Sequence, residues 1–277
     1  MKEVDEALAR AYARAPGGAS RPGHAGPPGP HRPVPPAPTS PAVHELADRG
    51  NRSESGIEIG GTAPLSHPAT ELLWPPVVLR LEQDWGDRFD RMASGLVADR
   101  DAHNLRTILF TSCHRAEGRT TLVLTLARAL ARRPGRTVVV DADLTGPMLA
   151  RLLGLRPDVG LDDIVEEGRS LDDALIEAPD DHLTVLPIRC PIGRPRDFLA
   201  SPGWTCTLAR LRRRFDLILL DGGPLFTGLS AAVLHRSVDA AVLVTHHGFT
   251  GERAIARARE VLEAGGVPLL GMAETFV

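Results

Sequence analysis

The stretch from Thr111 to Thr121, "TSCHRAEGRTT", has the residue types of a loop that could bind phosphate. It follows the apolar segment "RTILF" and precedes "LVLTLARALARR", so a strand, a tight loop and a helix are expected in that order. Backbone N–H groups at such a helix start can hold phosphate oxygens. The residues expected to bind a nucleotide are Cys113, His114, Arg115, Ala116, Glu117, Gly118, Arg119, Thr120 and Thr121.

The usual phosphate-loop pattern is G-x-x-x-x-G-K-[ST]. In this chain Cys113 stands at the first glycine, Gly118 at the second, Arg119 at the lysine and Thr120 at the hydroxyl. Only Gly118 and Thr120 match, so the regular expression alone is weak evidence. The strand before it and the helix after it strengthen the prediction of a phosphate loop (P-loop).

Acidic residues end two of the other apolar segments. Asp141 and Asp143 lie in "VVVDADL", where their i, i+2 spacing points both side chains the same way. Asp221 ends "LILLDGG". Carboxylates beside a phosphate loop can hold Mg²⁺ around a triphosphate, so Thr120, Asp141 and Asp221 are the expected metal site. Helix caps and solvated strand ends are the plainer alternative for these acids.

The remaining pattern predicts an α/β fold with a doubly wound, mostly parallel sheet of the P-loop NTPase type, because apolar strands alternate with helical stretches. Ligands of such sheets bind at the carboxyl ends of the strands. Strands are expected over 106–110, 136–143, 183–188, 215–221, 240–245 and 268–272, and helices over 84–97, 119–132, 147–153, 171–177, 203–213, 228–235 and 251–264.

The N-terminal quarter differs in composition. Residues 1–15 predict a short amphipathic helix that docks on a surface, and this helix contains Tyr12, the only tyrosine. Ten prolines lie between Pro16 and Pro41, and 42–70 stays polar. This composition predicts a disordered linker over 16–70. The folded domain is expected to span 71–277.

Charge and composition exclude several classes of protein. The chain has 277 residues, a net charge of −3 and 43% hydrophobic residues, so no nucleic-acid partner is expected. Three scattered cysteines, without a C-x-x-C pair, predict neither a zinc site nor a disulfide framework. No membrane span or signal peptide is evident. A cytoplasmic location fits best, peripheral at the inner membrane if a partner holds the protein there.

Together these motifs resemble the bacterial tyrosine kinases (BY-kinases), which belong to the P-loop ATPase group that includes MinD and ParA. "TSCHRAEGRTT" resembles that family's T-S-x-x-P-G-E-G-K-[ST]-[ST], and "VVVDADLTGPML" resembles its second Walker motif. "FDLILLDGGPL" is similar to its Walker B motif, and "RPRDFLASPGW" to its N-P-x-E-L-L-x-S. The opening "MKEVDEALARA" resembles free-standing members that act in exopolysaccharide biosynthesis or export.

The resemblance implies a set of roles. Arg119, Asp141 and Asp143 would be the catalytic residues, with Asp141 on the Mg²⁺ side or as the base for a tyrosine hydroxyl. Asp221 would hold a metal-bound water, and the cofactors would be ATP or ADP with Mg²⁺. The partner would be a membrane-embedded polysaccharide co-polymerase or chain-length regulator. The resemblance also implies a homo-oligomer, since the family forms one through a helix with E-x-x-R-x-x-R.

The chain departs from the family at several of these positions. Arg115 stands at a proline of the loop, Ala116 at a glycine, and Thr145 at an arginine after the second Walker motif. In the oligomer-forming helix the arginines remain as Arg88 and Arg91, but Trp85 replaces the glutamate. Gly222, Gly223 and Pro224 replace x-P-P, and the C-terminal tyrosine cluster is absent.

Arg119 decides between the possible functions. Arginine keeps the charge of lysine but carries a broad planar fork, so phosphate binding can survive while transition-state alignment suffers. The expected function is therefore a nucleotide-binding protein of exopolysaccharide or capsule assembly with weak or lost tyrosine kinase activity. An active kinase that phosphorylates a partner chain remains an alternative. A MinD/ParA-like positioning ATPase is disfavoured, because His114 stands where that group has its signature lysine.

Overall fold

The computed structural model describes residues 71–227 and 237–276. These residues belong to one compact unit of the chain. The docking helix expected over 1–15 with Tyr12, the linker expected over 16–70 and the helix expected over 228–235 lie outside the described residues.

A seven-stranded sheet forms the centre of the described part, in the order β3-β4-β2-β5-β1-β6-β7. Every neighbouring pair is parallel except β3 and β4. The expected doubly wound, mostly parallel sheet is therefore confirmed. The strands are β1 (Thr107–Ser112), β2 (Thr137–Ala142), β3 (Ile176–Ala178), β4 (Leu183–Leu186), β5 (Leu217–Pro224), β6 (Ala240–His246) and β7 (Leu269–Thr275).

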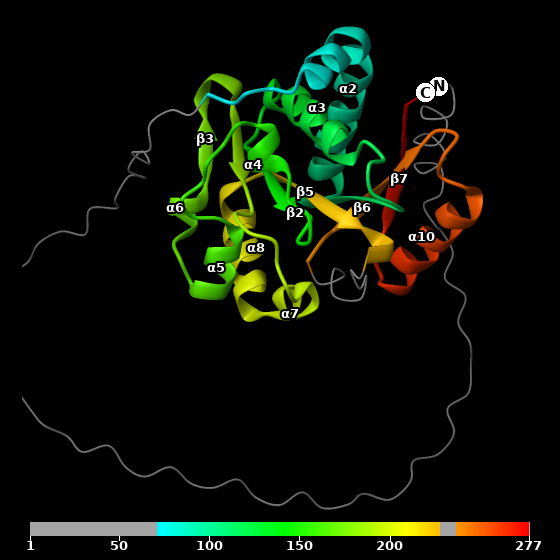
Figure 1. The fold of residues 1–277 in the computed structure, drawn as a ribbon. Coiled ribbons are helices and arrows are strands. Elements are labelled where there is room, and N and C mark those ends of the chain that lie inside the picture. Colours follow the sequence, from blue (N-terminus) through cyan, green and yellow to red (C-terminus); the bar gives the residue numbers. More distant parts are fainter. Residues whose placement is uncertain (1–70, 228–236, 277) are drawn as a thin grey trace, which may run out of the picture. The chain divides into compact units, whose positions relative to one another are not determined.

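Helices cover both faces of this sheet (Figure 1). One core cluster joins the sheet to α2 (Pro76–His103), α3 (Arg119–Ala131) and α4 (Leu149–Leu152). The other joins it to α5 (Leu161–Glu167), α6 (Leu171–Ala174), α7 (Pro195–Ala200), α8 (Pro202–Arg214) and α10 (Glu252–Ala264). Two 3₁₀ turns, η1 (Pro179–Asp181) and η2 (Leu225–Thr227), complete the described elements.

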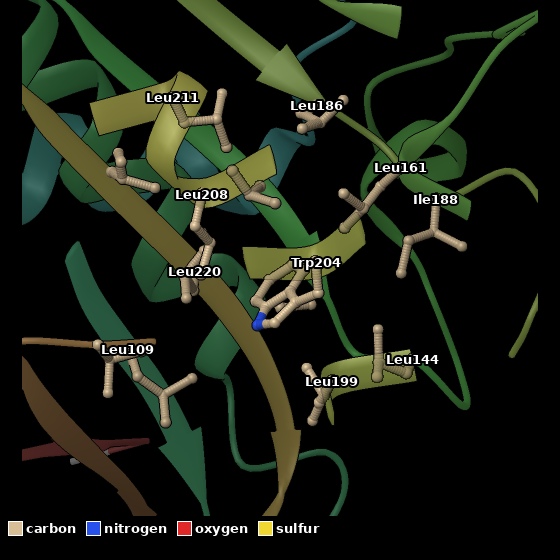
Figure 2. Close-up of a cluster of buried hydrophobic side chains, with 14 of the residues drawn as sticks. Leu109, Leu144, Leu161, Leu186, Ile188, Leu199, Trp204, Leu208, Leu211 and Leu220 are labelled. Carbon is tan, nitrogen blue, oxygen red and sulfur yellow. The ribbon is translucent and has the colours of Figure 1, made fainter. Parts of the chain in front are cut away.

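The two core clusters follow from the alternation of side chains along buried strands. In β1, Ile108 and Phe110 face the cluster that contains α3, while Leu109 faces the cluster that contains α8. On the second face Trp204 of α8 is fully buried among leucines from several elements (Figure 2). Its indole N–H donates to Ser237 Oγ at 2.9 Å, so the one polar atom of the ring is satisfied.

Two of the differences from the expected element boundaries have a direct physical reason. The helix expected from Asp84 begins at Pro76, where a proline suits the first helical turn. The helix expected over 171–177 ends at Ala174, because Ile176–Ala178 pairs with β4 as an antiparallel edge strand. The sequence did not predict the short helices α5 and α7, because each has too few residues to show the hydrophobic period of a helix.

The residues that the structure describes include no helix that is both long enough and apolar enough to cross a membrane.

Candidate functional site

The loop between β1 and α3 has a backbone suited to an anion. Gly118 takes φ +78° immediately before α3, and a Cβ there would lie 3.1 Å from the Thr275 side chain. No side chain of the described residues caps the start of α3. The first N–H groups of this 13-residue helix therefore have no intrahelical or side-chain acceptor, which is the arrangement that binds phosphate.

Glu117 anchors this loop from the inside. Its carboxylate is buried, accepts the His114 N–H at 3.0 Å and accepts the Thr250 hydroxyl at 2.5 Å. Its carbonyl accepts the Thr275 hydroxyl at 2.7 Å. The loop is thus held to the segments that follow β6 and end β7. The sequence predicts that Glu117 binds the nucleotide, whereas its carboxylate is bonded to His114 and Thr250.

Ala116 adopts φ +62°, a left-handed conformation that L-residues other than glycine rarely take. This is the position where the BY-kinase pattern has glycine. The loop therefore keeps the backbone shape that a glycine would favour, at a cost of about 1–2 kcal/mol.

The three aspartates lie together at the carboxyl ends of neighbouring strands. Asp141 and Asp221 are direct partners in the register of β2 and β5, and Asp143 follows two residues later. All three side chains are buried. The structure thus brings the sequence-predicted acids to the same end of the sheet as the loop.

Asp141 is held by backbone groups. Its Oδ2 accepts the N–H groups of Met148 and Leu149 at 2.9 Å, and its Oδ1 accepts the N–H of Asp143 at 3.2 Å. Burial raises the pKa of Asp141 to about 7, the charge of Asp221 adds to this, and the three N–H donors oppose it. Asp141 therefore orients the start of α4. Its pKa of about 7 leaves its carboxyl only partly ionised near neutral pH.

Arg119 turns away from solvent and bridges the other two acids. Its Nε donates to Asp221 Oδ1 at 2.8 Å, and its Nη2 donates to Asp143 Oδ2 at 3.1 Å. Its Nη1 donates to Ser112 Oγ at 3.1 Å. The side chain is only 9% exposed. Burial alone would lower the Arg119 pKa, but Asp221 and Asp143 raise it above the ordinary value, so this guanidinium stays charged.

Asp221 is also held in place by these contacts. Burial raises its pKa, while Arg119 and a hydrogen bond from Thr120 work in the opposite direction. Ser112, which no site prediction included, is therefore part of the same cluster through Arg119. The match of "TS" in "TSCHRAEGRTT" to the opening of the family pattern was its only signal in the sequence.

Arg115 brings a second guanidinium to Asp143 from the solvent side. Its Nη1 lies 3.2 Å from Asp143 Oδ2, and its Nη2 donates to Thr145 Oγ1 at 2.8 Å. A Cβ on Gly146 would lie 2.6 Å from the Arg115 Nη1, so glycine leaves room for this fork. Arg115, at a position where the family pattern has proline, thus contacts Thr145, which stands where that pattern has arginine.

The expected Mg²⁺ ligands do not fit a metal as they lie. The Thr120 side chain bonds Asp221, Asp221 is paired with Arg119, and both oxygens of Asp141 accept backbone N–H groups. No group of three or more His, Cys, Asp or Glu residues in the described ranges is arranged to hold a metal ion. The loop suits a phosphate, whereas the oxygens beside it are already bonded to protein donors.

Aromatic residues surround the outer rim of the loop, and the sequence motifs did not point to them. The His114 ring lies 5.8 Å from the ring of Phe226 and 6.3 Å from that of Phe249. His246 stacks on Phe276 at 4.4 Å. Cys113 contributes no reactive thiol, because burial and the charge of Glu117 raise its pKa to about 11.

The helix α2 carries the positions compared with the oligomer-forming helix of the family. The Arg88 guanidinium lies 4.5 Å from the centre of the Trp85 ring. Trp85, which stands at the glutamate of the family pattern, thus contacts Arg88 through a cation–π interaction.

Two curated relatives share sequence with this chain. It is 28% identical over 169 residues to tyrosine-protein kinase CpsD of Streptococcus pneumoniae, which covers 61% of this chain and 74% of that protein. It is 28% identical over 168 residues to tyrosine-protein kinase YwqD of Bacillus subtilis, covering 60% and 70%. No protein-family model matches the chain.

Solved structures agree with these relatives. The BceF tyrosine kinase domain superposes with a TM-score of 0.63 at 25% identity, covering 70% of this chain and 80% of that one. The kinase domain of Escherichia coli tyrosine kinase ETK superposes with a TM-score of 0.66 at 20% identity, covering 78% and 86%. The resemblance that the sequence motifs suggested is confirmed.

Proposed function

This chain is a relative of the bacterial tyrosine kinases in the MinD/ParA-related P-loop group. From this premise we propose that it binds a nucleotide with little or no phosphotransfer. Its role would be in the biosynthesis or export of an exopolysaccharide or capsule. The observation that carries the proposal is the Arg119 guanidinium, which is buried between Asp143 and Asp221.

Nucleotide binding is supported by the loop itself. The uncapped start of α3 supplies N–H groups and the positive end of the helix dipole, both of which favour phosphate. Glu117 holds the loop in this shape through His114 and Thr250. Arg115 stands at the rim with half of its side chain exposed, where it can reach a phosphate oxygen.

Weak catalysis is supported by the position of the charges. A phosphoryl transfer site depends on positioning and on electrostatic stabilisation of the transferred group. The charge of Arg119 already faces two carboxylates, and Asp141 is bonded to the backbone of α4. Misplacing one strong electrostatic contact typically lowers a rate by about 10²–10³.

An active kinase that acts on a partner chain is the second candidate. It is favoured by the retention of Thr120, Asp141, Asp143 and Asp221 at one end of the sheet. Nothing comparable favours a positioning ATPase, because the place of its signature lysine is His114.

The test combines binding with turnover. Calorimetry of the full chain with ADP and ATP is expected to show binding by the wild type. Transfer from γ-labelled ATP to a tyrosine peptide is expected to fall far below the rates of ordinary kinases, ~1–100 s⁻¹, and to rise in Arg119→Lys. Wild-type transfer at ordinary kinase rates would refute the loss of activity, and a protein that binds neither nucleotide would refute the proposal altogether.

The cellular role needs its own test. A membrane-embedded co-polymerase or chain-length regulator is proposed as the partner, which would place this protein at the inner face of the membrane. Deletion of the gene should change the amount or the length of a surface polysaccharide, and Arg119→Lys expressed in its place should restore it. An unchanged polymer in the deletion strain would contradict this role.

A further inference from the structure

The central feature of the site is the Arg119 guanidinium, a cation that the carboxylates of Asp143 and Asp221 share. Asp221 lies within β5, Asp143 follows the end of the neighbouring strand β2, and the Arg119 fork lies between them at 2.8 and 3.1 Å. The three side chains are 9%, 4% and 2% exposed, for Arg119, Asp143 and Asp221. Water therefore screens these charges little, and a divalent cation that came to the same oxygens would meet a fixed positive group.

The formal charges of the two bridged acids, Asp143 and Asp221, are already balanced. Two guanidinium groups, Arg115 and Arg119, face the two carboxylates Asp143 and Asp221. Arg115 also bonds Thr145, and Gly146 leaves room for its fork, so neither arginine is a chance surface contact. A second cation is not needed to neutralise the acids.

The arginines still have donors for a ligand. Arginine has five N–H donors in a fixed fork, and the three hydrogen bonds that the structure gives Arg119 use three of them. Arg115 is half exposed at the mouth of the loop. A guanidinium matches phosphate oxygens in pairs, which a single ammonium group does not.

We infer that this site binds the diphosphate or triphosphate of a nucleotide without a divalent cation, with the Arg119 and Arg115 guanidinium groups standing where the family pattern implies Mg²⁺. The inference rests on the proposed nucleotide binding and adds to it the form of the ligand. The ligand would be the metal-free nucleotide anion, and the loop N–H groups would complete its contacts.

The test uses the fluorescent nucleotide N-methylanthraniloyl-ADP and the full chain. Its dissociation constant is measured by anisotropy in excess EDTA and in excess MgCl₂. The two values for the wild type are expected to agree within about threefold, which is under 1 kcal/mol. Binding that requires MgCl₂ would overturn the inference and leave nucleotide binding intact, whereas absence of binding in both buffers would overturn both.

Arg119→Lys supplies the matching variant, because it keeps the charge and removes the planar fork. Its affinity in EDTA is expected to fall at least about tenfold and to recover when MgCl₂ is added. Arg128→Lys, on the same helix and paired with Glu82 and Asp181, is the control and should bind as the wild type does. Equal affinities of Arg119→Lys in both buffers would contradict the role of the fork.

A measurement of metal binding by the wild type tests the inference without depending on whether the variants fold. Electron paramagnetic resonance of Mn²⁺ with ligand-free protein should show no bound ion in the wild type. A bound Mn²⁺ signal in the wild type would overturn the inference whatever the variants do. Thermal melting of each protein checks that the variants are folded.

Discussion

Replacing Arg119 by alanine should leave two buried carboxylates without their cation. Asp143 and Asp221 are 4% and 2% exposed, so solvent cannot take over the role of the guanidinium. Removing one partner of a buried ion pair typically costs about 3–5 kcal/mol. We therefore expect Arg119→Ala to lower the free energy of unfolding by about that amount at pH 8.

The loss should depend on pH in a defined direction. Burial already raises the pKa of Asp221, and Arg119 is the largest influence against that rise. Without Arg119 the carboxyl should stay protonated to a higher pH in the folded state. A carboxyl with a raised pKa lowers the stability of the folded state as pH rises through that pKa. The free energy of unfolding should therefore fall less in Arg119→Ala at pH 5 than at pH 8.

Urea unfolding at both pH values measures the effect, with Arg128→Ala as control. Arg128 lies on the same helix, but its pairs with Glu82 and Asp181 are partly exposed. Together with the cation–π contact of Arg128 on the Trp74 ring, these part-buried pairs contribute about 1–2 kcal/mol. An Arg119→Ala loss no larger than the control's, and equal at the two pH values, would refute the buried bridge.

Three further outcomes follow from the same site. Ala116→Gly should raise the free energy of unfolding by about 1 kcal/mol, because φ +62° suits glycine, and an unchanged urea midpoint would contradict the strain. Ionisation of Asp141 should lower the free energy of unfolding as pH rises from about 4 to about 7, by about 4 kcal/mol at about 1.36 kcal/mol per unit of pKa, because its pKa of about 7 exceeds its ordinary 3.8. Asp141→Asn should flatten that slope, and equal slopes in the two proteins would exclude Asp141 as its source. Glu117→Ala should speed hydrogen exchange at the His114 amide, whose acceptor it removes, and unaltered exchange would show that the loop does not depend on it.

The sheet could be predicted from the sequence because its signals are local. Segments such as "RTILF" and "FDLILLD" contain the continuous apolar runs "ILF" and "LILL", as expected of strands buried on both faces. The order of strand, loop and helix around Thr111–Thr121 was predicted correctly. Short elements such as α5 and β3 carry too few residues for a period, and β3 depends on pairing with β4.

The direction of Arg119 could not be predicted, since its partners are distant in the chain. Asp143 lies 24 residues away and Asp221 lies 102 residues away, and only the parallel packing of β2 and β5 brings them together. Arg115 and Thr145 looked like separate departures from the family pattern. Their hydrogen bond across the mouth of the loop shows that they form one unit.

A crystal structure of the full chain grown with ADP in EDTA tests the central claim most directly. The account predicts phosphate density on the amides from Arg115 to Thr120, with the Arg119 fork still between Asp143 and Asp221. Density for the nucleotide elsewhere, or an Arg119 side chain that has left both carboxylates, would contradict it.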